Sequence, residues 1–322
     1  MPEIHEHSRQ EGDVFTAIGG TPLVELTRAT RPPGMRIFAK LEGGNPTGSI
    51  KDRIVFHMLA HARADGRLLP GQPIVEASTG NTGIALAMIA HRFGHPVEVV
   101  LPQNAYPPIT RLLTLYGAKL SWTPAQHGVA GALERARERA ADSGAYFLDQ
   151  FHDVTNCDTH YQTTGPEIWA QLPQADVFVA GIGTGGTLMG AGRYLKERNP
   201  ALRIVAAEAH PASQVQGLAS FAEGFLPPLL DFSLLDAKIL VRSADAFRAA
   251  RELVSREGIF GGVSAGAVLH VARVYAQRSG AHPDKPLNVV CVFADAGWKY
   301  LDSHLWVRDP APDEDLESTV WW

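Results

Sequence analysis

Four loops of this sequence are rich in glycine, serine and threonine, and one of them also carries a lysine. They read NPTGSIKDR (45–53), ASTGNTG (77–83), GIGTGGT (181–187) and GGVSAGA (261–267). The lysine, Lys51, stands just inside the start of a predicted helix and is one of only seven lysines in the chain. A lysine amine can form a Schiff base with an aldehyde, but most lysines are solvated surface charges. The role of Lys51 therefore has to be inferred from the other three loops.

The loop GIGTGGT is a candidate anion site. It follows a predicted strand and opens a predicted helix, so its glycines let backbone N–H groups close around an anion at the positive end of that helix. The hydroxyls of Thr184 and Thr187 add two donors to the same loop, which favours a single phosphate.

The same loop leaves two other interpretations open. Gly181, Gly183 and Gly186 satisfy G-x-G-x-x-G, and Glu208 ends the next predicted strand about twenty residues later, as a dinucleotide site requires. An NAD-dependent oxidoreductase is therefore one alternative. The other is a glycine turn that serves only the packing of a helix on a strand.

The loop ASTGNTG also lies between a predicted strand and a predicted helix. It offers the hydroxyls of Ser78, Thr79 and Thr82 and the amide of Asn81, a set of donors that suits a carboxylate. A helix N-cap would also explain a serine, threonine or asparagine here, although a cap needs only one side-chain oxygen. Ser264, at the start of another predicted helix, has the same cap interpretation.

Taken together, the loops describe one kind of ligand. A phosphate-binding loop, a carboxylate-binding loop and a lysine are what pyridoxal phosphate needs to hold an amino acid. The lysine binds the aldehyde, one loop anchors the phosphate and the other fixes the substrate's carboxylate. NAD would explain only one of these loops.

The elements around the loops follow an α/β pattern. Short runs rich in valine and isoleucine alternate with longer stretches of helical period, which predicts parallel sheets with crossover helices. The predicted strands are 73–77, 96–102, 118–123, 146–150, 176–181, 203–208 and 287–294, and the clearest helices are 81–94, 131–144 and 244–258, the last two ending at glycines. Ligands of such sheets bind at the carboxyl ends of the strands, where loops meet helix N-termini.

Composition narrows the class of protein. With 322 residues, 45% of them hydrophobic, we expect a soluble globular protein of about two domains. The net charge of −5 equals the five acidic residues of the segment 309–322, so the remainder is neutral and has no basic face for nucleic acid or a membrane. Cys157 and Cys291 lack the spacing of a disulfide framework or a metal site. The first residues have no apolar core, so we expect no signal peptide and a cytoplasmic location.

Several motifs in a fixed order resemble one known family, the cysteine synthase and cystathionine β-synthase group of fold-type II pyridoxal-phosphate enzymes. The resemblance covers almost the whole chain before the acidic tail, through IGGTPLVEL (18–26), KLEGGNPTGSIKDR, STGNTGIALAMIA, GAKL, TTGPEIW (163–169), GTGGTLMGAGRYLKE and GIFGGVSAGA. DAGWKYL (295–301) is most similar to sulfhydrylases that are sometimes specialised for O-phosphoserine.

The resemblance implies a fold and an assembly. Each of two domains would be a twisted, mostly parallel sheet flanked by helices, as in the tryptophan synthase β-subunit. A small mobile domain at 44–151 would carry the carboxylate loop and close on the substrate. A large domain made of 12–43 and 152–307 would bind the cofactor's phosphate, and 308–322 would form an acidic tail. The resemblance also implies a homodimer.

The resemblance assigns a role to residues of each loop. Lys51 would be the Schiff-base lysine, Asn81 would bind the phenolic oxygen of pyridoxal phosphate, and Ser264 would face its pyridine nitrogen. A serine there makes the cofactor a weaker electron sink than an aspartate would. The phosphate would be bound by Gly183, Thr184, Gly185, Gly186 and Thr187, and the substrate carboxylate by Ser78, Thr79, Thr82 and Gln150.

The implied reaction is a β-replacement that makes L-cysteine. A neutral Lys51 would remove the α-proton while the β-substituent leaves, giving an aminoacrylate intermediate to which a sulfur nucleophile adds. Phosphoserine-using relatives carry an arginine where this chain has Ala219, and residues 204–237 contain no arginine, which favours O-acetylserine over O-phosphoserine as the donor. Formation of cystathionine from serine and homocysteine is the nearest alternative, because the sequence does not fix the thiol.

The tail 309–322 supports a separate hypothesis. Its acidic, proline-containing part is typical of a solvated segment, but Trp321 and Trp322 are costly to leave in water. These tryptophans would fold over the mouth of the active site or dock on a partner. The tail therefore leaves a cofactor-bearing interaction scaffold as a third class of function.

Overall fold

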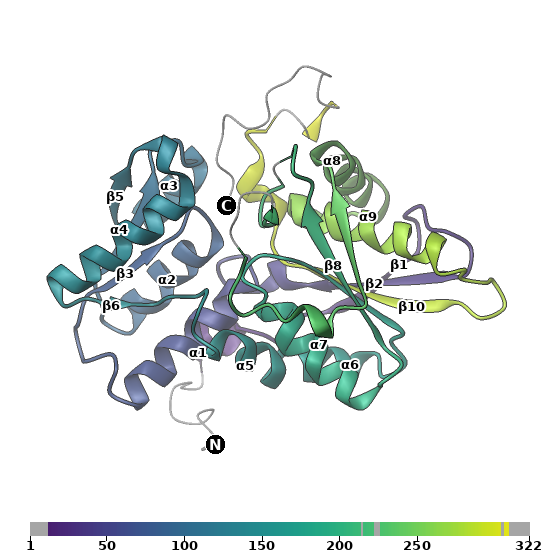
Figure 1. Cartoon of the computed structure of the whole chain (residues 1–322), viewed down its shortest axis with the longest axis horizontal. Helices are drawn as coiled ribbons and strands as arrows, with labels where there is room; N and C mark the ends of the chain where they lie inside the picture. The colour runs from purple at the N-terminus through teal and green to yellow at the C-terminus, as the bar shows by residue number, and fades with distance from the viewer. Residues whose placement is uncertain (1–11, 214, 222–225, 304–305, 309–322) are drawn as a thin grey trace. The chain divides into compact units, whose positions relative to one another are not determined.

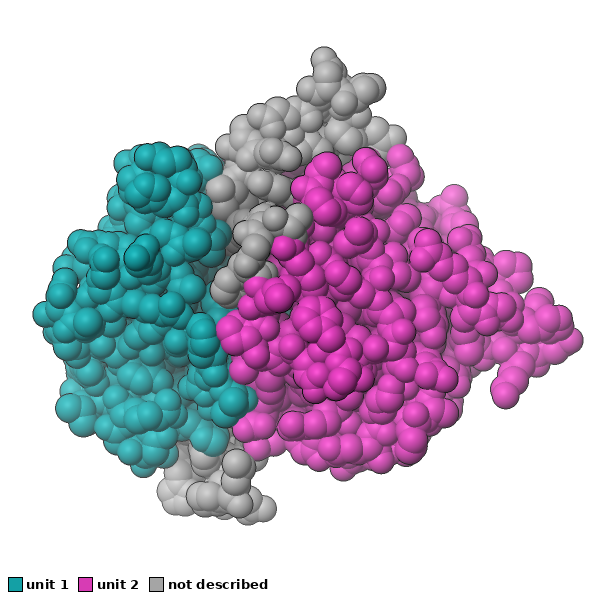
Figure 2. Space-filling view, viewed as in Figure 1, with its two compact units in different colours: residues 1–19, 45–156, 318–322 teal, residues 20–44, 157–317 magenta. Residues whose placement is uncertain are grey.

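The computed structural model describes residues 12–303 and 306–308, except for residue 214 and residues 222–225. The tail hypothesis at Trp321 and Trp322 lies outside the described residues. The described chain divides into two compact units (Figure 2). Unit 1 comprises residues 12–19 and Asn45–Asn156, and unit 2 comprises Gly20–Gly44 and the described residues of 157–308. Each unit combines one sheet with helices, so the predicted α/β class is confirmed.

Unit 1 is built on a four-stranded parallel sheet in the order β5-β4-β3-β6 (Figure 1). Its strands are β3 (Ile74–Ala77), β4 (Val97–Pro102), β5 (Lys119–Thr123) and β6 (Tyr146–Phe147). Its helices are α1 (Lys51–Ala64), α2 (Asn81–Arg92), α3 (Pro107–Leu115) and α4 (Gly128–Ser143), with short 3-10 turns at Val14–Ala17 and Ala125–His127. An apolar stripe of α4 packs on Val75, Ala77 and Val100, which fixes this helix to one face of the sheet.

Residues 12–19, which the sequence-based boundaries place with the large domain, belong to unit 1. Phe15 packs against Phe56 and Phe93, with ring centroids 5.0 Å and 4.9 Å away. Asp13 pairs with Arg92 at 3.2 Å. These aromatic contacts attach the N-terminal segment to α1 and to the end of α2.

Unit 2 is built on a six-stranded sheet in the order β1-β2-β10-β7-β8-β9. β1 (Leu23–Leu26) runs antiparallel to β2 (Met35–Leu41), and all other neighbours are parallel. The remaining strands are β7 (Val177–Gly181), β8 (Arg203–Ala209), β9 (Ala237–Val241) and β10 (Leu287–Phe293). The sequence does not predict β1, β2 or β9, because charged residues such as Lys40 interrupt their apolar pattern.

The helices of unit 2 lie on both faces of its sheet (Figure 1). They are α6 (Thr164–Gln171), α7 (Gly186–Arg198), α8 (Ser243–Glu252) and α9 (Val263–Arg278), with 3-10 turns at Glu42–Gly44, Phe232–Leu234 and Gly297–Tyr300. The core under α8 and α9 includes Val179, Val205, Val268 and Cys291, each at most 1% exposed. Both faces of the sheet are thus covered, as a parallel sheet requires.

Two predicted helix ends are confirmed. α4 ends at Gly144 with φ 68°, in the left-handed region that glycine favours. α8 continues as one π-helical turn over Leu253–Glu257 and stops at Gly258, with φ 69°.

α5 (Thr155–Gln162) spans the boundary between the two units. Among the described residues, no helix has both the length and the apolar character that a membrane crossing needs.

Candidate active site

Lys51 is the first residue of α1, and the loop before it is tied to the helix itself. The N–H of Thr47 donates to Asp52 Oδ2 at 2.7 Å, and the Thr47 hydroxyl donates to Asp52 Oδ1. The N–H of Lys51 lies 3.3 Å from Ser49 Oγ, which accepts it. Because Asp52 is fully buried, these bonds give Lys51 a defined backbone position.

The amine of Lys51 is adapted to losing its proton. The residue is half-buried, and burial lowers the pKa of Lys51 to about 8, while the carboxyl of Glu76 opposes the shift. About one amine in ten is then neutral at pH 7, against about one in a few thousand for an ordinary lysine. The neutral amine is the form that attacks an aldehyde or takes up a proton.

Ser78 has the role that a helix cap would have. Its Oγ accepts the N–H of Gly83 at 2.9 Å and the N–H of Gly80 at 3.3 Å, at the start of α2. The N-cap residue of α2 is Gly80, so Ser78 is not itself the cap, although its oxygen accepts N–H groups at the start of this helix. The Ser78 hydroxyl hydrogen has only a 3.5 Å contact to Gly80 O, so it remains available as a donor. Thr79 is buried beside it, and Asn81 is half-buried as the first residue of α2.

Thr82 and Gln150 meet although they are far apart in the sequence. Thr82 Oγ1 donates to Gln150 Oε1 at 2.6 Å, and the two residues are 3% and 6% exposed. The backbone oxygen of Gln150 accepts Nδ2 of Asn156 at 2.9 Å. Ser78, Thr82 and Gln150 therefore gather around the start of α2, within unit 1.

The chain turns sharply just before Gln150. Asp149 has φ 50°, and it is the one residue other than glycine with a positive φ among those described. Its N–H donates to Glu76 Oε2 at 2.9 Å, and its Oδ1 accepts His152 Nδ1 at 2.7 Å. The turn also explains why β6 is shorter than the predicted strand 146–150. Sequence reasoning missed Glu76 and Asp149, although a glutamate within an apolar strand run was a usable signal.

The predicted phosphate loop joins β7 to α7 within unit 2. The N-cap residue of α7 is Gly185, whose φ is 89°. Because glycine has no side chain, it cannot cap the first N–H groups of the helix, and these groups face the loop. A Cβ on Gly181 would lie 2.2 Å from Leu218 Cδ2, which shows how closely the chain approaches there. Thr184 is buried, and its Oγ1 lies 3.4 Å from the N–H of Gly186.

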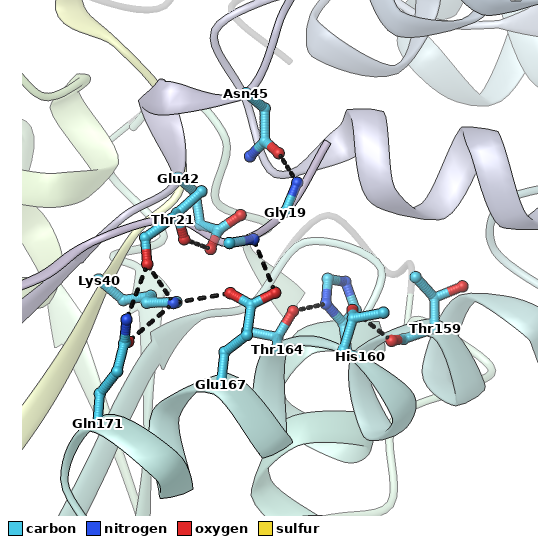
Figure 3. Close-up of polar contacts among 12 residues, drawn as sticks. Gly19, Thr21, Lys40, Glu42, Asn45, Thr159, His160, Thr164, Glu167 and Gln171 are labelled. Atoms are coloured by element: carbon cyan, nitrogen blue, oxygen red, sulfur yellow. Dashed lines mark hydrogen bonds and ion pairs between the residues drawn. The ribbon is translucent and has the colours of Figure 1, made fainter. Parts of the chain in front are cut away.

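Thr187 is held by a histidine that sequence reasoning missed. His160 Nε2 lies 3.3 Å from Thr187 Oγ1. His160 Nδ1 lies 2.9 Å from Thr164 Oγ1, as Figure 3 shows. His160 is 2% exposed, so the imidazole bridges α5, α6 and α7 inside unit 2. The phosphate loop thus has support from behind.

Ser264 lies in the first turn of α9, but it is not the cap. The N-cap of this helix is Gly262, with extended backbone. Ser264 is 6% exposed, and a Cβ on Gly217 would lie 3.7 Å from Ser264 Oγ. A Cβ on Gly183 would lie 3.5 Å from the backbone oxygen of the same Gly217. Ser264 and the phosphate loop therefore border the same glycine.

The dinucleotide alternative needs a free carboxylate on Glu208, and the structure does not provide one. Glu208 is 2% exposed, pairs with Lys238 and accepts the N–H of Phe221 at 3.0 Å. The carboxylate is thus already used inside the protein. NAD binding is not favoured.

Three of the sequence motifs outside these loops form a polar network in unit 2. Lys40 is fully buried, and its Nζ lies 2.8 Å from Glu167 Oε2, 2.6 Å from Thr21 O and 3.0 Å from Gln171 Oε1 (Figure 3). Thr21 Oγ1 donates to Glu42 Oε1 at 2.6 Å. The motifs IGGTPLVEL, KLEGG and TTGPEIW therefore serve the architecture of this unit.

The residues fit pyridoxal phosphate. Unit 2 offers the glycine-capped start of α7, where Cβ atoms would close the loop and where hydroxyls add donors for a phosphate. It also offers Ser264, whose hydroxyl can bond a pyridine nitrogen. Unit 1 offers a lysine of lowered pKa and hydroxyl and amide donors that suit a carboxylate.

Comparison with known proteins also indicates a pyridoxal-phosphate enzyme. A family model described as pyridoxal-phosphate dependent enzyme matches residues 14–295. Cysteine synthase B of Escherichia coli is 38% identical over 287 residues, which are 89% of this chain and 93% of that protein. The cysteine synthase of Aquifex aeolicus is 37% identical over 91% of each chain.

Solved structures are similar over nearly their full length. The cysteine synthase of Entamoeba histolytica superposes with a TM-score of 0.85 and 30% identity, covering 97% of this chain and 95% of that one. A hydrogen sulfide-producing enzyme of Fusobacterium nucleatum gives a TM-score of 0.84 and 34% identity, covering 90% and 99%.

Proposed function

We propose that this chain, which belongs to the family of pyridoxal-phosphate-dependent enzymes and makes cysteine with that cofactor, takes O-acetylserine as its amino-acid substrate. The observation that carries this choice is Ala219. Its N–H donates to Ile182 O at 2.7 Å, so Ala219 lies beside the phosphate loop, and it is 4% exposed.

A methyl group cannot bind a second phosphate. O-phosphoserine would bring a dianion, which needs a bidentate or cationic partner to replace its water. The phosphoserine-using enzymes that the sequence resembles carry an arginine at this position, and residues 204–237 of this chain contain none. An acetyl ester is neutral and needs no such partner.

Lys51 is the proposed base. Pyridoxal phosphate, when bound, withdraws electrons from the carbon that loses its proton. Nζ of Lys51 takes the α-proton while acetate leaves with the electrons of the Cβ–O bond. After sulfide has added at Cβ, Nζ returns the proton to Cα. A pKa of about 8 suits both directions, because the amine is neither strongly basic nor inert.

The substrate carboxylate is proposed to bind at Ser78, Thr79, Thr82 and Gln150. Thr82 occupies Oε1 of Gln150, which leaves Nε2 as the donor end of that amide. The Ser78 hydroxyl keeps its hydrogen for a second bond. These groups hold the amino acid in one orientation, so that its α-proton faces a single base.

The cofactor is proposed to bind through both sets of residues. Gly183, Thr184, Gly185, Gly186 and Thr187 bind its phosphate with backbone N–H groups and hydroxyls. Asn81 bonds its phenolic oxygen, and Ser264 bonds its pyridine nitrogen. A serine leaves that nitrogen without an ion pair, which favours rapid loss of the β-substituent.

We also propose that the protein is a homodimer and works in the cytoplasm, as its family resemblance implies. Light scattering coupled to size-exclusion chromatography tests the assembly. A mass of twice 34.8 kDa is expected, and a monomer at micromolar concentration contradicts the proposal.

The donor is tested by measuring cysteine formation from sulfide with the full-length holoenzyme. O-acetylserine, O-phosphoserine and serine are supplied in turn. We expect kcat/KM to be about tenfold or more higher for O-acetylserine than for the others, because a lost ionic contact is worth that much. A higher kcat/KM for O-phosphoserine contradicts the donor assignment, and full activity in Lys51→Ala contradicts the role of Lys51.

A further inference from the structure

One buried carboxyl group of unit 2 has no part in the mechanism so far. Glu208, near the end of β8, is 2% exposed. Its neighbours Ala207 and Ala209 belong to the core under α8 and α9. Because successive side chains of a strand alternate, Glu208 lies on the opposite face of the sheet. A buried carboxylate is costly unless it is paired and hydrogen-bonded, so its partners indicate what it does.

Glu208 has two partners, and these also contact each other. Oε1 accepts the N–H of Phe221 at 3.0 Å, and Oε2 forms an ion pair with Nζ of Lys238 on the neighbouring strand β9. Nζ of Lys238 lies 4.6 Å from the centroid of the Phe221 ring, within the range of a cation–π contact. Glu208, Lys238 and Phe221 therefore form a closed triangle, which we call the Phe221 anchor.

The Phe221 anchor holds one end of the segment 215–221. Within this segment the N–H of Ala219 donates to Ile182 O at 2.7 Å, and Ala219 O accepts the N–H of Ala209 at 3.1 Å. The segment is therefore bonded to the phosphate loop on one side and to the end of β8 on the other.

The bonds of Ala219 fix the backbone at one residue only. The next residue, Ser220, has a buried hydroxyl without a hydrogen-bond partner, so its side chain does not hold the chain. The bond to Glu208 fixes the backbone again at Phe221, two residues after Ala219. Two fixed points this close restrict the dihedral angles between them, and therefore also the direction of the Ala219 side chain.

We propose that Glu208 is a positioning residue for the amino-acid donor. By holding Phe221, it fixes the segment 215–221 against the phosphate loop, so that Ala219 keeps one distance and one direction from the β-substituent of the substrate. This inference rests on the proposed role of Ala219 in donor choice. An acid at the end of this strand binds a ribose in dinucleotide-binding proteins, whereas here it binds the protein's own chain.

The first test measures the Phe221 anchor without any substrate. Hydrogen exchange of the Phe221 amide is followed in the full-length holoenzyme by mass spectrometry with fragmentation to single residues. Glu208→Ala removes the acceptor, whereas the oxygen in Glu208→Gln still accepts the Phe221 N–H. We expect exchange at Phe221 to be about tenfold faster in Glu208→Ala and close to the wild-type rate in Glu208→Gln. Equal exchange in Glu208→Ala and the wild type overturns the proposal.

The second test measures steady-state kinetics in the same variants. We expect the KM for O-acetylserine to rise about tenfold in Glu208→Ala, while the KM for sulfide changes about twofold or less. Glu208→Gln should restore most of the wild-type KM for O-acetylserine. An unchanged KM for O-acetylserine in Glu208→Ala, or an equal rise in both variants, overturns the proposal.

Glu98→Ala is the matched control. Glu98, on β4 of unit 1, also pairs with a lysine of the neighbouring strand, with Lys119 Nζ 3.1 Å from Glu98 Oε2. We expect this variant to leave the exchange of Phe221 and both KM values unchanged. A similar rise of the KM for O-acetylserine in Glu98→Ala overturns the proposal.

Glu208→Asp covers the case in which Glu208→Ala does not fold. It keeps a charge near Lys238 but shortens the side chain by one carbon, so the bond to the Phe221 N–H is lost and the same changes are expected. Wild-type values of both quantities in Glu208→Asp overturn the proposal. The exchange result does not depend on the donor. The proposed function fails separately, if the wild-type enzyme makes no cysteine from O-acetylserine.

Discussion

Thr82 Oγ1 donates a 2.6 Å hydrogen bond to Oε1 of Gln150 and so joins the start of α2 to the turn that follows β6. A primary amide has chemically different ends, an acceptor and a donor. The hydroxyl of Thr82 selects which end of Gln150 faces the remaining donors of the carboxylate loop. One short side chain therefore orients another.

Replacement of Thr82 by valine tests this orientation. The shape is kept while the hydroxyl is lost, so Gln150 can present either end. We expect KM for O-acetylserine to rise about tenfold, equivalent to one hydrogen bond, with a smaller change in the KM for sulfide. Steady-state kinetics with each substrate varied in turn measures both. Thr114→Val, at an exposed position of α3, is the control, and equal kinetics in the two variants would contradict the assignment.

Gly185→Ala tests the phosphate loop. Gly185 has φ 89°, and a Cβ there would lie 3.3 Å from Leu230 Cβ, so alanine is strained by about 1–2 kcal/mol. We expect the Kd for pyridoxal phosphate to rise about tenfold, measured by titrating the cofactor-free protein. Gly144→Ala carries the same backbone strain at the end of α4, with nothing within 4 Å of the added Cβ. It should leave that Kd unchanged, and a similar loss in both would point to general destabilisation.

Ala219→Arg tests the choice of donor. The added guanidinium lies next to the phosphate loop, through the bond between Ala219 and Ile182, and can form a bidentate pair with a substrate phosphate. We expect kcat/KM for O-phosphoserine to rise about tenfold relative to that for O-acetylserine. Ala201→Arg, at an exposed position, controls for added positive charge. No change in the ratio of the two donors would show that donor choice is made elsewhere.

The stability of the fold should depend on pH through Glu76. Its pKa rises from 4.5 to about 8 on folding, so the folded chain binds more protons than the unfolded chain between these values. Stability contributed by Glu76 is complete below about 4.5 and falls as pH rises toward 8. Glu76→Gln should therefore have a free energy of unfolding about 4 kcal/mol higher than the wild type at pH 8, and nearly the same as the wild type at pH 4.5. Calorimetry of both proteins at pH 8 and pH 4.5 tests this prediction. A difference in stability that is the same at both pH values would contradict a buried carboxyl with a raised pKa.

The positions of the loops could be predicted because local chemistry determines them. Glycines at strand ends mark tight turns, and Lys51, Ser78 and Ser264 stand at helix starts, where backbone N–H groups are free. The glycine ends of α4 and of the π-helical turn follow from the same local rule. These features need only a few neighbouring residues.

The supporting polar groups could not be predicted because their partners are distant in sequence. Lys40 is buried by its pairing with Glu167, 127 residues further along, and nothing near Lys40 indicates this. The role of His160 on α5 depends on its contact with Thr187 on α7, and these residues are 27 positions apart in the sequence. A single sequence also cannot separate cap from ligand at Ser78, since its hydroxyl oxygen accepts an N–H group at the start of α2 and its hydrogen remains.

Asp149 is an obvious position to substitute in an attempt to make this protein more thermostable. It occupies a left-handed backbone conformation that glycine adopts without strain, so Asp149→Gly would relieve about 1 kcal/mol of backbone strain and at the same time remove the carboxylate that lies 2.7 Å from His152 Nδ1. The same change would loosen the turn that delivers Gln150 to Thr82. Resistance to heat and selectivity for the amino acid therefore pull in opposite directions at one residue, and a programme that selects for melting temperature alone would trade one for the other.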